Sequence, residues 1–141
     1  MSAEQNKAIV MRVVEEAQSQ HRLEVVDELF AADFVDHCVP PGLPPDREGV
    51  KMQFGMFFAA FPDLKVVVDD QVAEGDTVVT RKTFHGTHAG ELMGIPPSGR
   101  KIAFEVIDIL RVRDGKITDH WNVVDQLGLL RQIGAARFSG I

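Results

Sequence analysis

The fold of this 141-residue chain is decided by residues 101–124, which read KIAFEVIDILRVRDGKITDHWNVV. Most even-numbered residues from 102 to 112 are apolar, and the stretch is interrupted by the turn sequence Asp114-Gly115-Lys116. Alternation with a period of two is typical of a half-buried strand, and a short loop containing Asp-Gly is typical of a hairpin. The stretch therefore predicts two antiparallel strands, over residues 101–113 and 117–124.

The register of this hairpin decides which side chains share a face, because a slip of one residue moves every side chain to the opposite face. A two-residue loop would place Leu110 opposite Asp119. A three-residue loop, Asp114-Gly115-Lys116, instead places Arg111 opposite Asp119 and Ile109 opposite Trp121. Cross-strand pairs of opposite charge, or of two apolar residues, stabilise a sheet by about 0.2–1 kcal/mol each. We therefore expect the three-residue loop.

In that register one face of the hairpin is apolar except for three neighbouring polar residues. Its members are Phe104, Val106, Asp108, Leu110 and Val112 on the first strand and Thr118, His120, Asn122 and Val124 on the second. Polar groups on an apolar face are costly to bury unless they are hydrogen-bonded or serve a function. An apolar surrounding also raises the pKa of a carboxyl group, which suits acid–base chemistry near neutral pH. This face predicts a pocket, and a fully bonded polar network inside the core is the alternative.

The opposite face of the hairpin combines Ile107, Ile109 and Trp121 with charged residues. Such a face is too apolar for free solvent and too polar for a core. A subunit interface with a polar rim explains it best, so we expect a homodimer through this face. The alternative is that the last helix or the C-terminal tail covers it.

The remainder of the chain predicts helices first and strands second, which is an α+β layout in one domain over residues 1–141. Ser2 and Gln5 have the spacing of a capping box, and Asp46 and Asp125 each precede an apolar helical pattern, as N-cap residues do. We expect helices over residues 2–17, 23–30, 46–61 and 126–133, and a second hairpin over residues 64–73 and 77–85.

Residues outside the last hairpin also qualify for the pocket. Asp36 and His37 lie in a short extended stretch before a proline-rich loop, the helix over residues 46–61 is rich in Phe and Met, and Arg81 lies in mid-strand. The ordinary interpretations are turn formation, core packing and an ion pair of Arg81 with Asp69. As pocket residues that contact substrate we expect Asp36, His37, Phe54, Phe58, Arg81, Val106 and Leu110.

The composition excludes several classes of protein. Lys and Arg number 15 against 21 Asp and Glu, and this net charge of −6 argues against nucleic acid or an anionic membrane as the main partner. The single cysteine, Cys38, excludes an internal disulfide framework. Residues 1–10 do not resemble a signal peptide, and no apolar run has the length of a membrane span, so we expect a cytoplasmic protein.

His85, His88 and Glu91 have a spacing that superficially resembles a set of metal ligands. They fall at a strand end and in a glycine-rich loop, where helical geometry cannot bring them together. We therefore expect neither a metal nor a cofactor. Tyrosine is absent from the chain, so no phenol donor is available for chemistry.

Motifs spread over nearly the whole chain carry a family resemblance. They are Phe61-Pro62-Asp63-Leu64, Gly86-Thr87-His88-Ala89-Gly90-Glu91, Gly94-Ile95-Pro96-Pro97-Ser98-Gly99-Arg100, Asp114-Gly115-Lys116-Ile117, His120-Trp121 and Asp125-Gln126-Leu127-Gly128-Leu129-Leu130. With these motifs the chain resembles the SnoaL-like polyketide cyclases of the nuclear-transport-factor-2-like superfamily. The resemblance implies a cone in which helices pack on a strongly curved antiparallel or mixed sheet and enclose an apolar cavity. It also implies a homodimer through the outer face of the sheet.

The chemistry that the resemblance implies is an intramolecular aldol closure without metal or cofactor. In the cyclases a carboxylate removes a proton beside one carbonyl, and the resulting enolate attacks a second carbonyl of the same molecule. Aligned through the Asp-Gly-Lys-Ile motif, the acid/base aspartate of the family falls at Asn122, its histidine neighbour at Asp108 and an early-loop asparagine at Asp36. We therefore expect Asp108 to be the base, His120 to orient it or share its proton, and Asn122 to donate a hydrogen bond to the oxyanion.

The leading hypothesis is a cofactor-independent ester cyclase that acts on a bulky, hydrophobic carbonyl compound. A non-catalytic protein that binds a small hydrophobic molecule is the alternative from another class, and Asn122 favours it. Cofactor-free hydroxylation and epoxide hydrolysis share the fold, but hydrolysis uses an Asp–Arg–Asp set of which Asp108 and Arg81 supply only two members. The missing tyrosine excludes the Tyr-plus-Asp oxyanion hole that steroid isomerases build on this fold.

Overall fold

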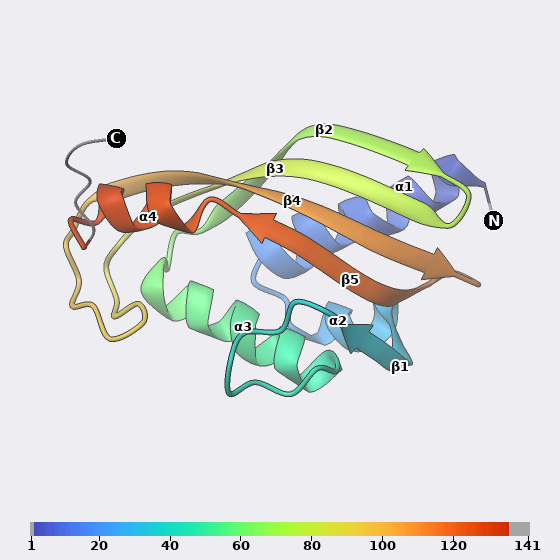
Figure 1. Cartoon of the computed structure of the whole chain (residues 1–141), viewed down its shortest axis with the longest axis horizontal. Helices are drawn as coiled ribbons and strands as arrows, with labels where there is room; N and C mark the ends of the chain where they lie inside the picture. Colours follow the sequence, from blue (N-terminus) through green and yellow to red (C-terminus); the bar gives the residue numbers. More distant parts are fainter. Residues whose placement is uncertain (1, 136–141) are drawn as a thin grey trace.

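A computed structural model describes residues 2–135 as one mixed five-stranded sheet with helices packed under its curved surface (Figure 1). The helices are α1 (Ala3–Arg12), the π-helix η1 (Val13–Ser19), α2 (Glu24–Leu29), α3 (Arg47–Ala60) and α4 (Gln126–Gln132). The strands are β1 (Phe30–Asp36), β2 (Lys65–Glu74), β3 (Thr77–Thr87), β4 (Lys101–Arg113) and β5 (Lys116–Val124). Their order is β1-β5-β4-β3-β2, with β1 parallel to β5 and the other neighbours antiparallel. The predicted α+β architecture is confirmed.

The helix starts follow the capping residues that the sequence predicts. Ser2 and Gln5 form a reciprocal capping box, and the side chains of Asp46 and Asp125 accept hydrogen bonds from the first turns of α3 and α4. Each cap satisfies a backbone N–H group that a helix start leaves unpaired. The first helix differs from the prediction at its end, because it continues to Ser19 as the π-helix η1. Among residues 2–135, no helix is both long and apolar enough to cross a bilayer.

The turn between β4 and β5 corrects the predicted loop but keeps the predicted register. Asp114 and Gly115 both have positive φ, 50° and 77°, and Arg113 pairs with Lys116, so the loop has two residues rather than three. Asp-Gly tolerates positive φ at both positions, which gives the primed turn that matches strand twist. Thr118 is then the extra residue of a bulge, because Val112 pairs with Ile117 and Arg111 pairs with Asp119.

The bulge has two consequences for the faces of the sheet. Ile117 turns inward and is fully buried, whereas Thr118, predicted on the inner face, donates its hydroxyl to Asp119 on the outer side. Beyond the bulge, the predicted pairs Ile109–Trp121 and Asp108–Asn122 are confirmed. The inner face of β4 is therefore buried as expected, and Asp108 lies among its apolar residues.

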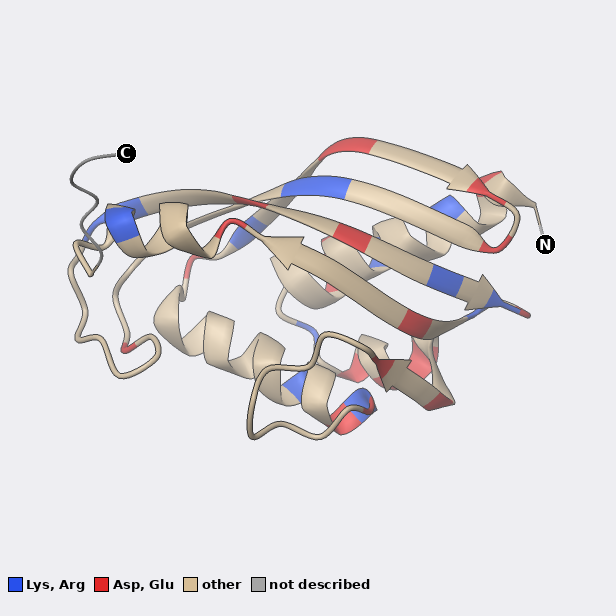
Figure 2. Ribbon diagram, in the orientation of Figure 1, with Lys and Arg blue, Asp and Glu red and all other residues tan. Residues whose placement is uncertain are grey.

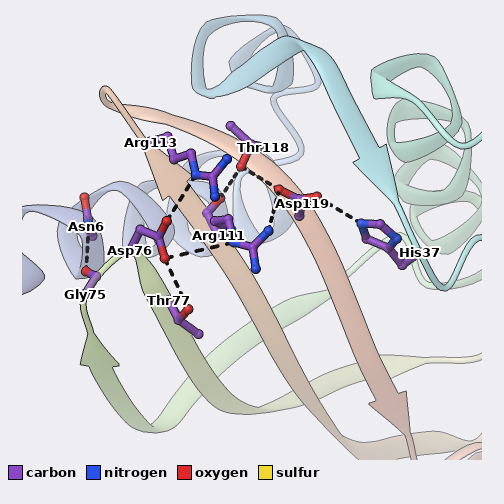
Figure 3. A network of polar contacts seen from close by, with 9 residues as sticks. All are labelled: Asn6, His37, Gly75, Asp76, Thr77, Arg111, Arg113, Thr118 and Asp119. Atoms are coloured by element: carbon purple, nitrogen blue, oxygen red, sulfur yellow. Dashed lines mark hydrogen bonds and ion pairs between the residues drawn. The ribbon is translucent and has the colours of Figure 1, made fainter.

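The outer face of β4 and β5 leaves apolar side chains exposed beside a network of ion pairs (Figure 3). Ile107, Ile109 and Val123 are 42%, 39% and 73% exposed. Trp121 stacks on the His37 ring at 4.4 Å between centroids, and the Arg111 guanidinium carbon lies 5.4 Å from the indole ring. No element among residues 2–135 covers these apolar side chains, and a cover by residues 136–141 lies outside the described residues.

Candidate active site

A pocket lies between the inner face of the sheet and the helices α3 and η1. Its inner part is a cavity of about 60 Å³. Apolar side chains from every surrounding element form most of the wall, among them Val13, Phe30, Val50, Phe54, Phe57, Phe84, Val106, Leu110 and Val124. Figure 2 shows α3 without charge after its first turns, which agrees with the uncharged sequence from Met52 to Ala60. The polar groups of the pocket therefore stand out against an apolar surround.

Four ionisable side chains form a continuous chain in this pocket, in the order Lys82, Asp108, His120 and Asp36. The Lys82 ammonium contacts one carboxylate oxygen of Asp108. The other oxygen lies 2.8 Å from Nε2 of His120, and Nδ1 of His120 lies 3.0 Å from Oδ1 of Asp36. These side chains, which we call the charged chain, are between 3% and 16% exposed.

Strand register brings the charged chain together. Asp108 lies opposite Asn122 and His120 opposite Leu110, so Asp108 and His120 are diagonal neighbours on one face. Asp36, at the end of β1, is the parallel partner of His120 on β5. Lys82 reaches Asp108 from β3, on the other side of β4.

The electrostatics of the charged chain favour ions at every position. The expected rise in the pKa of Asp108 is wrong: burial acts to raise this pKa, but the Lys82 charge and the His120 hydrogen bond outweigh burial and lower it to about 2. Burial acts to lower the pKa of His120, but its two carboxylate partners raise this pKa to about 9. The pKa of Asp36 is also lowered, because His120 and the Cys38 N–H outweigh burial. At neutral pH the chain thus holds two carboxylates and two cations.

Asn122 completes the polar lining of the pocket. Its side-chain amide faces the inner cavity and has no hydrogen-bond partner among residues 2–135. It also lines a second cavity of about 450 Å³, which we call the outer chamber. Gln53, Phe57 and Val124 are shared by the two cavities in the same way. The outer chamber is walled by apolar residues of the Cys38–Leu43 loop, of α3 and of the segment around Met93.

The structure brings seven of the ten sequence-predicted site residues to the inner cavity: Asp36, Phe54, Val106, Asp108, Leu110, His120 and Asn122. The other three lie elsewhere. His37 is on the outer face of the sheet, where it stacks on Trp121 and bonds to Asp119. Phe58 stacks on His21 and lines neither cavity.

Arg81 is the third misplaced residue, and the structural alternative for it is correct. Its guanidinium lies 3.9 Å from Asp69 and 3.6 Å from Glu105, on the solvent side of β3. Because side chains alternate along a strand, the cation that reaches the pocket is its neighbour Lys82. The Asp108–Arg81 pair considered for epoxide hydrolysis is therefore not formed.

The sequence prediction missed Lys82 and Gln18. A signal for Lys82 existed, because Val78 and Phe84 lie at even positions of the same strand, and both face inward with it. Gln18 also had a signal, because it lies four residues after Val14 on the apolar face of the predicted helix, but that prediction ended at residue 17. The structure continues the helix as η1 and places Gln18 in the pocket, with Oε1 3.2 Å from Lys82 Nζ.

His85, His88 and Glu91 do not converge. His88 is buried and bonds through Nδ1 to Ser98, whereas His85 and Glu91 are exposed. Within the described part of the chain, no three His, Cys, Asp or Glu side chains are placed to hold a metal ion.

Comparison with known proteins places this architecture in a family. Residues 8–133 match the family model described as SnoaL-like polyketide cyclase. The chain is 30% identical over 115 residues to the nogalonic acid methyl ester cyclase of Streptomyces nogalater, an alignment that covers 80% of this chain and 86% of that protein. It is 42% identical over 60 residues to the aklanonic acid methyl ester cyclase DnrD of Streptomyces peucetius, which covers 43% of this chain and 41% of that one. Among solved structures, TsrD from Streptomyces laurentii superposes with a TM-score of 0.88 at 29% identity, over 96% of this chain and 99% of that one.

Proposed function

This chain belongs to the SnoaL-like polyketide cyclase family, and from that premise we propose that it is a cofactor-independent cyclase. It closes a ring by intramolecular aldol addition in a bulky, hydrophobic carbonyl compound of the polyketide methyl ester class. The observation that carries the proposal is the buried carboxylate of Asp108, which lies between Lys82 and His120 in a pocket whose wall is mostly apolar. The two relatives named for methyl ester cyclisation support the substrate class.

The proposed reaction needs no co-reactant. Asp108 removes a proton from the carbon beside one carbonyl, and the electron pair moves onto that carbonyl oxygen as an enolate. The enolate carbon then forms a bond to a second carbonyl carbon, whose oxygen becomes an alkoxide. The protonated Asp108 returns its proton to this alkoxide, so the product is an isomer of the substrate.

The neighbours of Asp108 have supporting roles in this proposal. His120, fixed between two carboxylates at 2.8 Å and 3.0 Å, positions Asp108 and stabilises its charge. The unpaired amide of Asn122 donates a hydrogen bond to the enolate oxygen. Asp36 lines the inner cavity and bonds to Nδ1 of His120, so we propose that it positions His120 and contacts the substrate. The apolar side chains of Phe54, Val106 and Leu110 contact the hydrophobic part of the substrate.

A non-catalytic ligand-binding protein is the second candidate, because Asn122 occupies the position at which the family resemblance places an acid/base aspartate. One experiment separates the two functions. Aklanonic and nogalonic acid methyl esters are incubated with the protein, and products are followed by chromatography and mass spectrometry. Cyclisation gives a product of unchanged mass and altered retention, whereas a binding protein returns the ester unchanged.

The residue assignment is tested with matched carboxylate variants. Asp108→Asn should lower turnover by about 10²- to 10⁴-fold, the usual contribution of a general base. Asp119→Asn, on the outer face of the neighbouring strand, should stay within about twofold of the natural protein. Asp108→Asn leaves the buried Lys82 ammonium without its carboxylate partner. The double variant Asp108→Asn/Lys82→Met, which removes both charges, is therefore measured together with Asp108→Asn. Full turnover in either Asp108 variant would contradict the assignment.

We also propose that the outer face of β4 and β5 packs against a second copy of this chain. The exposed side chains of Ile107, Ile109 and Val123, next to the stacked Trp121, support this interface. The charged residues of Figure 3 then form its polar rim.

A further inference from the structure

The Lys82 ammonium is the least expected group in the pocket. Lys82 is only 4% exposed, and its Nζ lies 5.4 Å from the centroid of the Phe84 ring. A buried ammonium needs partners, because an isolated charge in an apolar site is strongly destabilising. Lys82 has two, the carboxylate of Asp108 and the amide oxygen of Gln18.

These two contacts leave one donor of Lys82 unused. An ammonium has three N–H groups, and no third acceptor faces Lys82 among residues 2–135. The residue lines the inner cavity, so the remaining donor is available to a ligand there. His120, the other cation of the pocket, has no donor to spare, because both ring nitrogens are bonded to carboxylates.

The charge balance of the pocket shows what ligand this donor suits. The charged chain is neutral as a whole, with two carboxylates, Lys82 and His120. When Asp108 accepts a proton from a ligand, its own negative charge is lost and an equal charge appears on the ligand oxygen. Lys82 is then left without its carboxylate partner and beside a new anion, at no change in net charge.

We infer that the inner pocket binds its ligand as a conjugated oxygen anion, an enolate of a 1,3-dicarbonyl compound or a phenolate, with Lys82 as the counter-ion. The inference rests on the proposed function and names the ligand class of the same site. Lys82 is thus a catalytic residue of the proposed cyclisation, and Gln18, held by the π-turn of η1, is its positioning residue.

The ion pair with Asp108 excludes a covalent role for Lys82. Attack of an amine on a carbonyl needs a free lone pair on nitrogen, whereas Nζ of Lys82 donates to Asp108 and Gln18. Lys82 therefore acts as a charge and a hydrogen-bond donor, with no imine formed.

The size of the cavities fixes how the ligand lies. The inner cavity of about 60 Å³ has room for the acidic oxygen and a few attached atoms, and the outer chamber of about 450 Å³ has room for the rest. Asn122 and Phe57 line the boundary between the two. The charged end of the ligand therefore lies at Lys82 while its hydrophobic body stays in the outer chamber.

The test uses 4-nitrophenol, whose phenolate absorbs in the visible range and whose phenol does not, and 4-nitroanisole, which cannot ionise. Binding to the natural protein should increase the phenolate band at a pH where the free dye is partly ionised. Lys82→Met should abolish the increase and weaken phenolate binding by about 10- to 100-fold, as for loss of a charge-assisted hydrogen bond. The affinity of Lys82→Met for 4-nitroanisole should differ from that of the natural protein by less than about twofold. Arg81→Gln, on the opposite face of β3, is the control variant, and its affinity for 4-nitrophenol should also change by less than about twofold.

Circular dichroism shows whether Lys82→Met is folded, and two further variants test the inference if it is not. Lys82→Arg keeps the charge and should keep the phenolate band, and Gln18→Met should weaken it partly. Equal phenolate binding by Lys82→Met and the natural protein would overturn the inference, as would binding of the dye as neutral phenol. A lysine adduct trapped by borohydride would also overturn it.

The dye does not turn over, so this test is independent of cyclisation. A protein that ionises the dye through Lys82 but leaves the methyl esters unchanged would refute the proposed function alone. A protein that cyclises the esters but binds phenolate equally without Lys82 would refute the inference alone.

Discussion

On each face of the sheet at the β4–β5 hairpin, a histidine, an aspartate and a basic residue lie together, but their surroundings differ. On the inner face His120 contacts Asp108, which contacts Lys82; on the outer face His37 contacts Asp119, which lies 3.7 Å from Arg111. The inner Lys82 and Asp108 side chains are each 6% exposed, whereas those of Arg111 and His37 are 35% and 37% exposed. Water reaches the outer Arg111 and His37 side chains readily and the inner Lys82–Asp108 pair hardly at all.

Burial therefore decides what each set can do. Ion pairs on a surface are screened and stabilise a fold by about 0–1 kcal/mol, whereas a buried charge that loses its partner is strongly destabilising. Burial and close partners also shift the pKa values of the inner set far from their ordinary range, downward for Asp108 and upward for His120. Residue type alone therefore does not identify a site; the surrounding dielectric does.

The largest change in the free energy of unfolding is expected when one ion pair is broken on the inner face, and the matched control breaks one on the outer face. Lys82→Met leaves Asp108 buried without its cation and should lower the free energy of unfolding by about 3–5 kcal/mol. Arg111→Met removes a half-exposed guanidinium and should lower it by less than about 1 kcal/mol. Urea denaturation of both variants measures the difference.

The charge-balanced variant tests whether the loss of stability in Lys82→Met comes from the unpaired charge of Asp108. Asp108→Asn/Lys82→Met removes both charges, so it should regain much of the stability that Lys82→Met loses. Equal losses in Lys82→Met and Arg111→Met would mean that the inner pair is as screened as the outer one.

A smaller effect is expected from pH. The pKa of His120 rises from 6.5 to about 9 on folding, so its contribution to stability is complete below pH 6.5 and is lost as the pH rises through 9. The pKa of Asp108 falls from 3.8 to about 2, so its contribution is complete above pH 4 and is lost as the pH falls through 2. The free energy of unfolding should be greatest between these limits.

Unfolding by urea across the pH range checks this profile, with His120→Gln as the control. The alkaline decrease between pH 6.5 and 9 should be present in the natural protein and weaker in His120→Gln. An identical decrease in both would assign it to other groups.

The smallest effect on the fold of one subunit is expected on the outer face. Ile109→Asp places a charge in the proposed interface and should convert a dimer to a monomer in analytical ultracentrifugation, while cyclisation per subunit changes by less than about twofold. Leu110→Asp, the neighbouring change on the inner face, should instead abolish folding. A natural protein that is already monomeric would contradict the proposed dimer.

The sequence predicted the fold and most of the inner set because both follow from alternation along strands. The pairing of Asp108 with Asn122 needed only the register of one hairpin, and Asp36 was a candidate from its place before the proline-rich loop and from the family resemblance. Three features were not predicted: the bulge at Thr118, Lys82 and Gln18. The bulge at Thr118 has no clear sequence signature, since a two-residue turn plus a bulge gives the same register as a three-residue loop.

Lys82 escaped for a different reason. Arg81 and Lys82 are adjacent cations on one strand, and only the strand's parity tells which of them faces the pocket. Gln18 was missed because the predicted helix ended at residue 17, although helical spacing from Val14 places Gln18 on the same buried face.

The proposed active site depends most on the ionisation of the charged chain at neutral pH, and one measurement tests this ionisation directly. A heteronuclear NMR titration follows the imidazole nitrogens of His120, assigned by the loss of their signals in His120→Gln. We expect this imidazole to stay doubly protonated through pH 7 and to lose one of its two ring protons only near pH 9. Loss of the proton at or below the ordinary pKa of 6.5 would contradict it.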